Sequence, residues 1–468
     1  MVACTIYRYK TKNEQQMAYT KFLHEFSTKQ QHDTARSYGD GGEYHEPWVA
    51  CVDDGSELVT YNKGWAEKYL TFKALEDGTF SFTKSGVNYS IDGGETWTEL
   101  AENTSTPTVS AGGTIMFKAT LTPEDYSGIG SFGSTGRYEA MGNPYSLLYG
   151  DGFDSVTDFS NKNYAFYDLF VNSVGLTSAD KLVLPATTLA EYCYGSMFSG
   201  CTSLTTAPEL PATTLAMNCY RNMFQDCTAL TEAPVLPATT LSDICYSNMF
   251  NGCTSLAAAP VLPATTLARY CYDGMFQDCT SLTTAPALPA TTLAQFCYTG
   301  MFKGCTSLTT APELPATTLT KYCYQGMFTS CTSLTEAPVL PATTLDIYCY
   351  QGMFIDCTSL VTAPELPATT LTDGCYESIF RNCTSLTAAP ELPATTLADY
   401  CYSGLFRGCA SLNYIKAMFT TTPSDDYTLN WVNGVASSGT FVKNSAANWN
   451  VTGVNGIPTG WTVETASA

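Results

Sequence analysis

The chain has 468 residues, 44% of them apolar, so it can bury a large core and form more than one domain. Its net charge of -21 works against nucleic acid or an anionic membrane surface as a partner. No apolar run approaches the roughly 18 residues of a membrane span, and the first residues lack the apolar stretch of a Sec signal peptide.

Residues 1–64 are expected to form an N-terminal anchoring region, a helix followed by a hairpin. Apolar residues recur on one side of 13–29, and 48–61 alternates around Asp53-Asp54-Gly55, which is a turn signal. This region holds all three histidines of the chain, which lack the cysteine or carboxylate spacing of a metal site: His24, His32 and His45. They are therefore interpreted as surface residues.

Residues 65–149 contain short β-patterned runs separated by turn signals, which favours a small antiparallel sandwich. Within it, Ser90-Ile-Asp92-Gly-Gly94-Glu-Thr96-Trp97 resembles the Asp box of sialidase propellers, a hairpin that lies away from the chemistry in that family. A glycan-active enzyme is thus one alternative. A single copy without a set of arginines to hold a carboxylate favours a structural turn.

A second apparent motif, Gly128-Ile-Gly130-Ser-Phe-Gly133, fits the glycine pattern of dinucleotide-binding loops. Such a loop must open a helix, whereas Ser134-Thr-Gly136-Arg-Tyr138 reads as more turn and strand. No cofactor is expected.

The rest of the chain is organised around a unit of 26 residues that is written nine times between 184 and 412. The run Leu-Pro-Ala-Thr-Thr-Leu begins at 184 and returns every 26 residues up to 392. A fixed period of this size indicates a solenoid, in which each unit buries its apolar face against its neighbours. Residues 150–183 read as a degenerate capping repeat, 184–419 as the solenoid and 420–468 as a β-rich C-terminal cap.

Five positions of the unit hardly vary, and they fall within an arc of about 140° if that stretch is helical: Cys193, Tyr194, Met197, Phe198 and Cys201. The positions between them differ from copy to copy, as on a solvated face. We therefore predict a rung of strand, turn, short helix and turn. Pro208 cannot donate to a sheet, so the strand should be only two or three residues wide.

The run Met-Phe-x-x-Cys-Thr-Ser-Leu-Thr-x-Ala-Pro-x-Leu-Pro resembles the BspA-like class of bacterial leucine-rich repeats. That class is found on surface proteins of gut and oral bacteria and on phages of gut Bacteroidales. The resemblance covers 184–412 and implies an α/β leucine-rich-repeat solenoid with a binding role and no catalysis. The rung is longer than that family usually shows, and Pro208 inside the strand is a second departure.

Eighteen of the 20 cysteines belong to the two repeat columns that begin at Cys193 and Cys201. On a helix these two lie roughly 12 Å apart, and helices of adjacent rungs pack about 8 to 10 Å apart, beyond the roughly 7 Å reach of a disulfide. Both columns are therefore expected to be buried free thiols. The spacing also fails for zinc.

Because strands stack more closely than helices, the strand side should be concave. Its outward positions carry six carboxylates and no basic residue, and they form the candidate binding surface: Glu209, Glu232, Glu313, Glu336, Glu365 and Glu391. We expect a protein or glycan on a cell or mucosal surface as the partner, and contacts with other virion or surface proteins through the N-terminal region. A homo-oligomer is compatible with this organisation.

These features lead to two main hypotheses on function. The first is a non-catalytic attachment or decoration protein, a phage virion fibre or capsid-decorating component that is located on the virion or extracellular surface. A bacterial cell-surface adhesin is its variant, and the glycan-active enzyme is the alternative from another class. A purely structural spacer is a third.

Overall fold

The computed structural model describes residues 49–53, 57–61, 68–156 and 158–466, and the chain divides into two compact units, 1–64 and 65–468. In the first unit, β1 (Val49–Asp53) and β2 (Glu57–Tyr61) pair antiparallel, which confirms the predicted hairpin. The helix expected over 13–29 and the three histidines lie outside the described residues.

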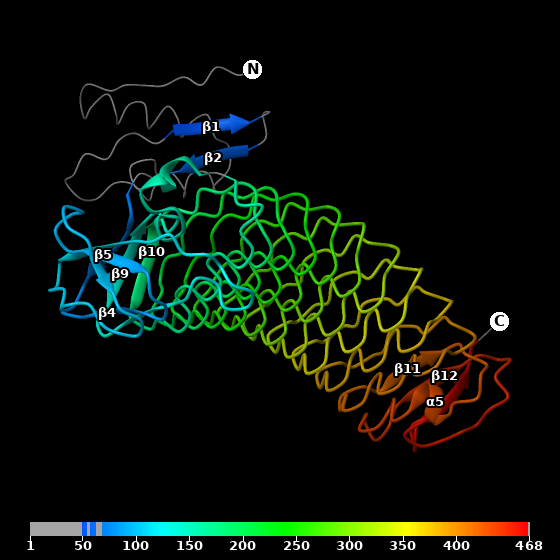
Figure 1. Cartoon of the computed structure of the whole chain (residues 1–468). Coiled ribbons are helices and arrows are strands. Elements are labelled where there is room, and N and C mark those ends of the chain that lie inside the picture. Colours follow the sequence, from blue (N-terminus) through cyan, green and yellow to red (C-terminus); the bar gives the residue numbers. More distant parts are fainter. Residues whose placement is uncertain (1–48, 54–56, 62–67, 157, 467–468) are drawn as a thin grey trace, which may run out of the picture. The chain divides into compact units, whose positions relative to one another are not determined.

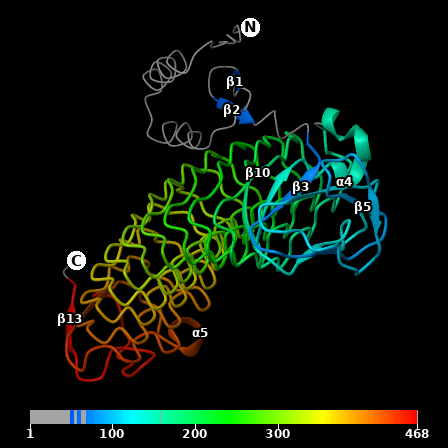
Figure 2. The same ribbon diagram turned by 90° about the vertical axis from the view of Figure 1, so that its left-hand side faces the viewer.

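The second unit begins with a six-stranded sheet, in which only β10 runs parallel to a neighbour. Its strands β5, β9 and β10 are labelled in Figure 1, and β3 is labelled in Figure 2. The strands lie in the order β10-β9-β3-β7-β5-β6: Leu176–Leu182, Tyr138–Gly142, Leu70–Ala74, Thr114–Lys118, Val87–Ser90 and Thr98–Leu100. The strands within 65–149 pair only antiparallel with one another, as the sequence predicts for these residues, and the sheet is mixed because β10 comes from 150–183. The short helix α4 (Ser146–Tyr149) and the 3-10 helix η1 (Gly150–Ser155) follow β9.

A smaller two-stranded sheet packs against this one through aromatic rings. It pairs β4 (Phe80–Phe82) with β8 (Phe132–Ser134), and the ring of Phe72 in β3 lies 5.2 Å from Phe80 and 4.8 Å from Phe132. Phe72, Phe80 and Phe132 are almost fully buried. Burial of these rings holds the two sheets together.

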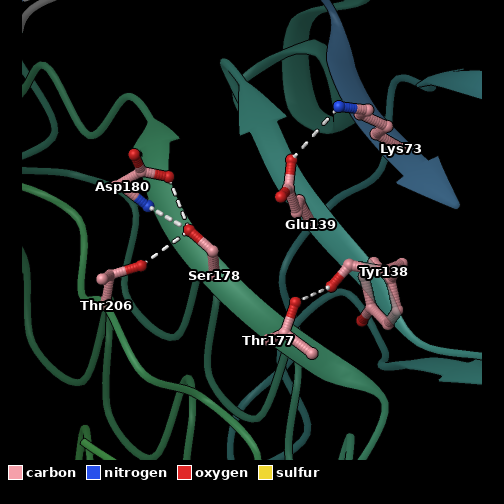
Figure 3. Close-up of polar contacts among 7 residues, drawn as sticks. All are labelled: Lys73, Tyr138, Glu139, Thr177, Ser178, Asp180 and Thr206. Carbon is pink, nitrogen blue, oxygen red and sulfur yellow. Dashed lines mark hydrogen bonds and ion pairs between the residues drawn. The ribbon is translucent and has the colours of Figure 1, made fainter. Parts of the chain in front are cut away.

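The large sheet continues directly into the repeats, and Figure 3 shows the junction. The hydroxyl of Thr177 in β10 donates to the carbonyl of Tyr138 in β9 at 3.0 Å. The hydroxyls of Ser178 and Thr206 share a hydrogen bond of 2.7 Å, and the two residues also form a parallel bridge. The β-rich region and the first repeat therefore belong to one continuous sheet.

Along the repeats this ladder narrows to one bridging residue per rung. From the second rung on, these residues recur at intervals of 26: Glu232, Ala258, Thr284, Thr310, Glu336, Thr362, Ala388 and Tyr414. At the far end, β11 (Tyr414–Ala417), β12 (Thr440–Lys443) and β13 (Thr462–Thr465) widen it again into a parallel sheet. A proline stands two positions after each bridging residue except Tyr414 and limits the width there, as argued for Pro208, whereas Lys416 takes that place where the sheet widens.

The stretch predicted to be helical contains no helix in any of the repeats, and this prediction was wrong. It is a series of overlapping β-turns: amides of Cys193, Gly195 and Met197 donate to carbonyls three residues back. The amides between them donate to the next rung, for example Tyr194 to Cys219 at 3.1 Å and Phe198 to Met223 at 2.9 Å. The rungs are thus hydrogen-bonded to one another on this side as well.

Left-handed residues at every fourth position build these turns. In the first rung they are Tyr192, Ser196 and Gly200, with φ of 54°, 52° and 74°. The equivalents of Ser196 and Gly200 are glycine, asparagine, aspartate or serine in all nine copies. Glycine, asparagine and aspartate tolerate this conformation best, so the sequence selects turns.

The invariant columns form the core, as predicted, in the form of stacked rings. Centroids of successive phenylalanines lie from 5.3 Å (Phe170–Phe198) to 5.9 Å (Phe380–Phe406) apart. Strands stack at about 4.8 Å, so the two sides of a rung have similar spacing. The expectation of a concave strand side rested on the wide spacing of packed helices, and the repeats contain no helices that would impose it.

Neighbouring rungs also interlock at the column of Gly200. A Cβ added to Gly252 would meet the Oδ1 of Asp226 in the preceding rung at 2.2 Å, and one added to Gly304 would meet Asp278 at 2.0 Å. The same relation joins Asn172 to Gly200 and Asn382 to Gly408. In these pairs the aspartate or asparagine requires glycine in the rung that follows.

Both ends of the stack are covered by aromatic side chains. At the start, Tyr164, Asp168 and Asn172 repeat the left-handed positions, and the hydroxyl of Ser173 bonds that of Tyr138 at 2.8 Å. At the other end, the ring of the buried Trp431 lies 6.3 Å from Phe406, and its Nε1 donates to the carbonyl of Gly456 at 2.9 Å.

Candidate functional site

The repeats expose two different surfaces. The strand face carries the ladder residues and the carboxylates that the sequence singles out. The turn face carries the outward positions of the β-turns, which are 191, 192, 195, 196, 199 and 200 in the first rung and their equivalents at steps of 26. These positions vary, while the exposed Thr187 is identical in all nine copies, so exposure alone does not account for the variation.

The six glutamates of the strand face do not form one cluster. Glu232 and Glu336 belong to the bridging column, whereas the other four stand three positions further along their rungs. Glu313 lines a hollow of about 320 Å³ among prolines of two rungs. Valine or alanine occupies the intervening copies of its column, so the strand face is less acidic than the sequence argument implies.

Two of these glutamates are tied into the fold. Burial raises the pKa of Glu209 to about 7. Glu391 pairs with Lys416 of β11 at 2.9 Å, so a basic residue does reach this face, contrary to the expectation. The strand face offers neither a deep cavity at these residues nor an uninterrupted acidic row.

A longer groove of about 470 Å³ runs along the turn face, which the sequence argument had set aside. Its floor and two walls come from three columns of the repeat. The lining residues are Asp273, Gln277, Thr299, Gly300, Lys303, Gln325, Gly326, Thr329, Gln351, Gly352, Ile355, Glu377, Ser378 and Arg381.

Glycines make the floor, and two of them, Gly300 and Gly326, have open space above them, whereas the side chain of Ile355 lies over Gly352. A Cβ added to Gly300 or Gly326 would meet nothing closer than 3.4 Å, whereas one added to Gly274 would meet the Oδ1 of Asn248 at 2.3 Å. Asn222 and Asn248 occupy the same column with the same left-handed backbone. The groove therefore exists because glycine replaces asparagine in these rungs.

The walls carry polar side chains that are ordered by hydrogen bonds between rungs. The Nε2 of Gln325 donates to Gln351 at 2.6 Å, and that of Gln351 donates to Glu377 at 2.8 Å. Burial raises the pKa of Asp273 to about 6. The Nε of Arg381 is buried and has no hydrogen-bond partner among the described residues.

Beside the groove, partly exposed rings form an aromatic ladder, defined as Tyr270, Phe296, Tyr322 and Tyr348. Their centroids lie 4.4, 4.6 and 5.3 Å apart in nearly parallel planes. All four have positive φ, as do Tyr192, Ile244 and Tyr400 in the same column of other rungs. Bulky residues are strained there, and this strain belongs to the rung as a whole and is not confined to the groove. The hydroxyl of Thr299 in the groove wall donates to the carbonyl of Tyr322 at 2.9 Å.

The N-terminal motifs support no chemistry. The amide of Gly94 donates to Ser90 and that of Thr96 to Asp92, at 2.9 and 3.0 Å, so these residues close the turn between β5 and β6. The loop at Gly128 leads into strand β8 and not into a helix. Among the described residues, no group of three or more histidine, cysteine, aspartate or glutamate side chains could hold a metal ion, and no helix could cross a membrane.

One signal in the sequence could have revealed the groove. The floor column reads Gly at 274, 300, 326 and 352, after Asn222 and Asn248 and before Ser378. A run of glycines marks a place where side chains are missing. Motifs of catalytic, charged or metal-binding residues do not include such a run. The aromatic ladder begins in the same rungs.

Stacked rungs with hydrogen bonds on both sides define the class: a leucine-rich repeat solenoid that presents long surfaces. The BspA type leucine rich repeat region matches in 6 copies, over 162–309, 272–387 and 300–433. The chain belongs to this family, whose repeats suggest a surface-exposed or adhesion-type protein.

Comparison with other proteins adds little. No curated protein matches the chain. A solved structure described as "Crystal structure of TLR13-ssRNA13 complex" is similar over 61% of this chain and 46% of its own, at 12% identity and a TM-score of 0.25. The chain thus spans under half of that protein's length, and a likeness at this level bears on neither fold nor function.

Proposed function

We propose that the chain is a non-catalytic attachment or decoration protein that displays its solenoid on a virion or a bacterial cell and binds a protein or glycan of a host or mucosal surface. In this proposal 1–64 anchors the protein to other virion or surface proteins. Residues 65–149 form a sandwich-like domain, 150–183 a capping repeat, 184–419 a solenoid of nine rungs and 420–468 a C-terminal cap.

The observation that carries the proposal is the groove with its glycine floor. It spans five rungs and lies beside the aromatic ladder. The side chains ordered there are amides, hydroxyls and charges, which are suited to binding.

The decisive experiment fills the groove without disturbing the turns. The double variant Gly300→Asn, Gly326→Asn places asparagine where Asn222 and Asn248 already stand in the same backbone conformation. We expect the half-saturating concentration for epithelial or bacterial cells, measured by flow cytometry, to rise at least about tenfold.

The matched control is Ser330→Asn, which adds the same side chain at a left-handed position four residues after Gly326 and outside the groove lining. Asp356 follows it in the next rung, and an asparagine and an aspartate fit side by side in this column, since Asn382 donates to Asp356 at 2.8 Å. It should bind like the parent chain. Equal binding by the double variant and the control would refute the groove as the binding site.

The strand face remains the rival surface and has its own variant. Glu313, Glu336 and Glu365 changed together to Lys reverse the charge of three candidate residues that are exposed. Loss of cell binding in this variant, with full binding in the double groove variant, would move the site to the strand face. Copurification with virions or with bacterial envelopes would then decide between the two locations.

A further inference from the structure

Two neighbouring rungs of the groove repeat part of their chemistry. Gln325 and Gln351 are equivalent, as are Gly326 and Gly352, and Tyr322 and Tyr348. The other wall residues differ from rung to rung. Two successive rungs at the centre of the groove therefore offer the same amide and the same glycine, which suits a ligand with a repeating unit.

The charges of the groove indicate a ligand without net charge. Two carboxylates, Asp273 and Glu377, are balanced by Lys303 and Arg381 along the lining. A polyanion would also meet a chain with a net charge of -21. Between these charges lie Gln325 and Gln351, whose amides both donate and accept hydrogen bonds.

The backbone of the floor argues against an extended polypeptide. The amides of Gly300 and Gly326 donate to Gln325 and Gln351, each at 2.8 Å, so the floor has no free strand edge to which a peptide could add. Side chains on one face of a strand recur about every 6.6 Å, whereas hydrogen-bonded rungs recur at about 4.8 Å. A peptide would lose register with the walls within a few rungs.

We propose that the groove binds a neutral, linear, hydroxyl-rich glycan that lies along the solenoid, which rests on the proposed function and names its ligand class. A pyranose ring in a linear chain advances by close to one rung, so two successive sugars meet the equivalent groups of the Gln325 and Gln351 rungs. Its hydroxyls bond Thr299, Gln325 and Gln351, and its C–H groups pack against the edges of the aromatic ladder. The open ends of the groove accept the interior of a polymer.

The test is isothermal titration calorimetry of the full chain with neutral linear oligosaccharides of glucose, mannose, xylose and N-acetylglucosamine. Polygalacturonate and heparin fragments represent the charged class. We expect at least one neutral series to bind, with an affinity that rises with chain length and falls at least about tenfold in the double variant Gly300→Asn, Gly326→Asn. Ser330→Asn should retain the affinity, and the charged fragments should bind at least about tenfold more weakly.

The outcomes separate this proposal from the function on which it rests. If no neutral glycan binds, or the charged fragments bind as well, the ligand class is wrong; loss of cell binding in the groove variant would still uphold the groove. Loss of that binding after trypsin treatment of the cells, without any glycan binding, would assign a protein partner. If a glycan binds equally to the double variant, both the ligand class and the site fail.

Discussion

The tyrosine column places a hydroxyl group in the core at every rung, and its surroundings differ along the stack. The hydroxyl of Tyr194 bonds that of Tyr145 at 2.8 Å. Four others are buried without a partner among the described residues: Tyr246, Tyr324, Tyr350 and Tyr376. A buried polar group without a partner costs about 1 to 3 kcal/mol, so packing of the stacked rings has to offset it.

This difference gives a matched pair of substitutions that remove only an oxygen. Tyr350→Phe should leave the free energy of unfolding unchanged or raise it, because the hydroxyl has no partner to lose. Tyr194→Phe should lower it by about 0.5 to 1.5 kcal/mol, since a buried hydrogen bond disappears. Urea unfolding followed by circular dichroism measures both. An equal loss in the two variants would show that the hydroxyl of Tyr350 is satisfied by water.

At the scale of the element, the sequence identified the buried face correctly but assigned it the wrong secondary structure. Cys193, Tyr194, Met197, Phe198 and Cys201 are all buried. Their spacing of four fits tandem turns as well as a helix, because over so short a stretch a period of 4 differs little from 3.6. The glycine and asparagine columns distinguish the two structures, and they also make the groove. The sequence points to the candidate glutamates because charged residues can be recognised in it. It does not point to the groove in that way, because the groove forms where side chains are missing.

Because the rungs are bonded on both sides, damage to one should spread to its neighbours. The ring of Phe302 stacks on Phe276 at 5.8 Å and on Phe328 at 5.6 Å. Phe302→Ala should cost about 3 to 5 kcal/mol, and hydrogen exchange should accelerate in both adjacent rungs as well as its own. The exposed neighbour Lys303→Ala serves as the control. Faster exchange confined to one rung would contradict this coupling.

For the whole molecule, the geometry of the stacked rungs explains why the repeat cysteines are free thiols. The sequence predicts free thiols from helix spacing, which the structure does not contain. Hydrogen-bonded rungs lie about 4.8 Å apart, which is within the Cα range of a disulfide. The eighteen repeat cysteines are nevertheless free and buried. Equivalent side chains point the same way and keep their Cβ atoms apart. In the second column the thiol is also engaged, as in Cys227, which donates to the carbonyl of Phe198 at 3.1 Å.

Titration of thiols tests this state directly. Burial raises the pKa of Cys201 and Cys219 to about 12, so little thiolate forms at pH 8. The folded protein should leave the eighteen repeat cysteines unreacted with iodoacetamide. After denaturation without a reductant, mass spectrometry should find all eighteen alkylated. Fewer would reveal disulfides between rungs.

The interlock at the column of Gly200 restricts how the gene can change length. Removal of the single rung that contains Gly252 would bring Asp278 next to Asp226, so two like charges would face each other without the amide through which Asn382 bonds Asp356 at 2.8 Å in the same column. Removal of the single rung that contains Asp226 would instead bring Gly252 next to Gly200 and cause no clash. Unequal recombination in this part of the gene should therefore yield stable proteins when an aspartate rung or a whole pair of rungs is lost, and destabilised ones when a glycine rung alone is lost.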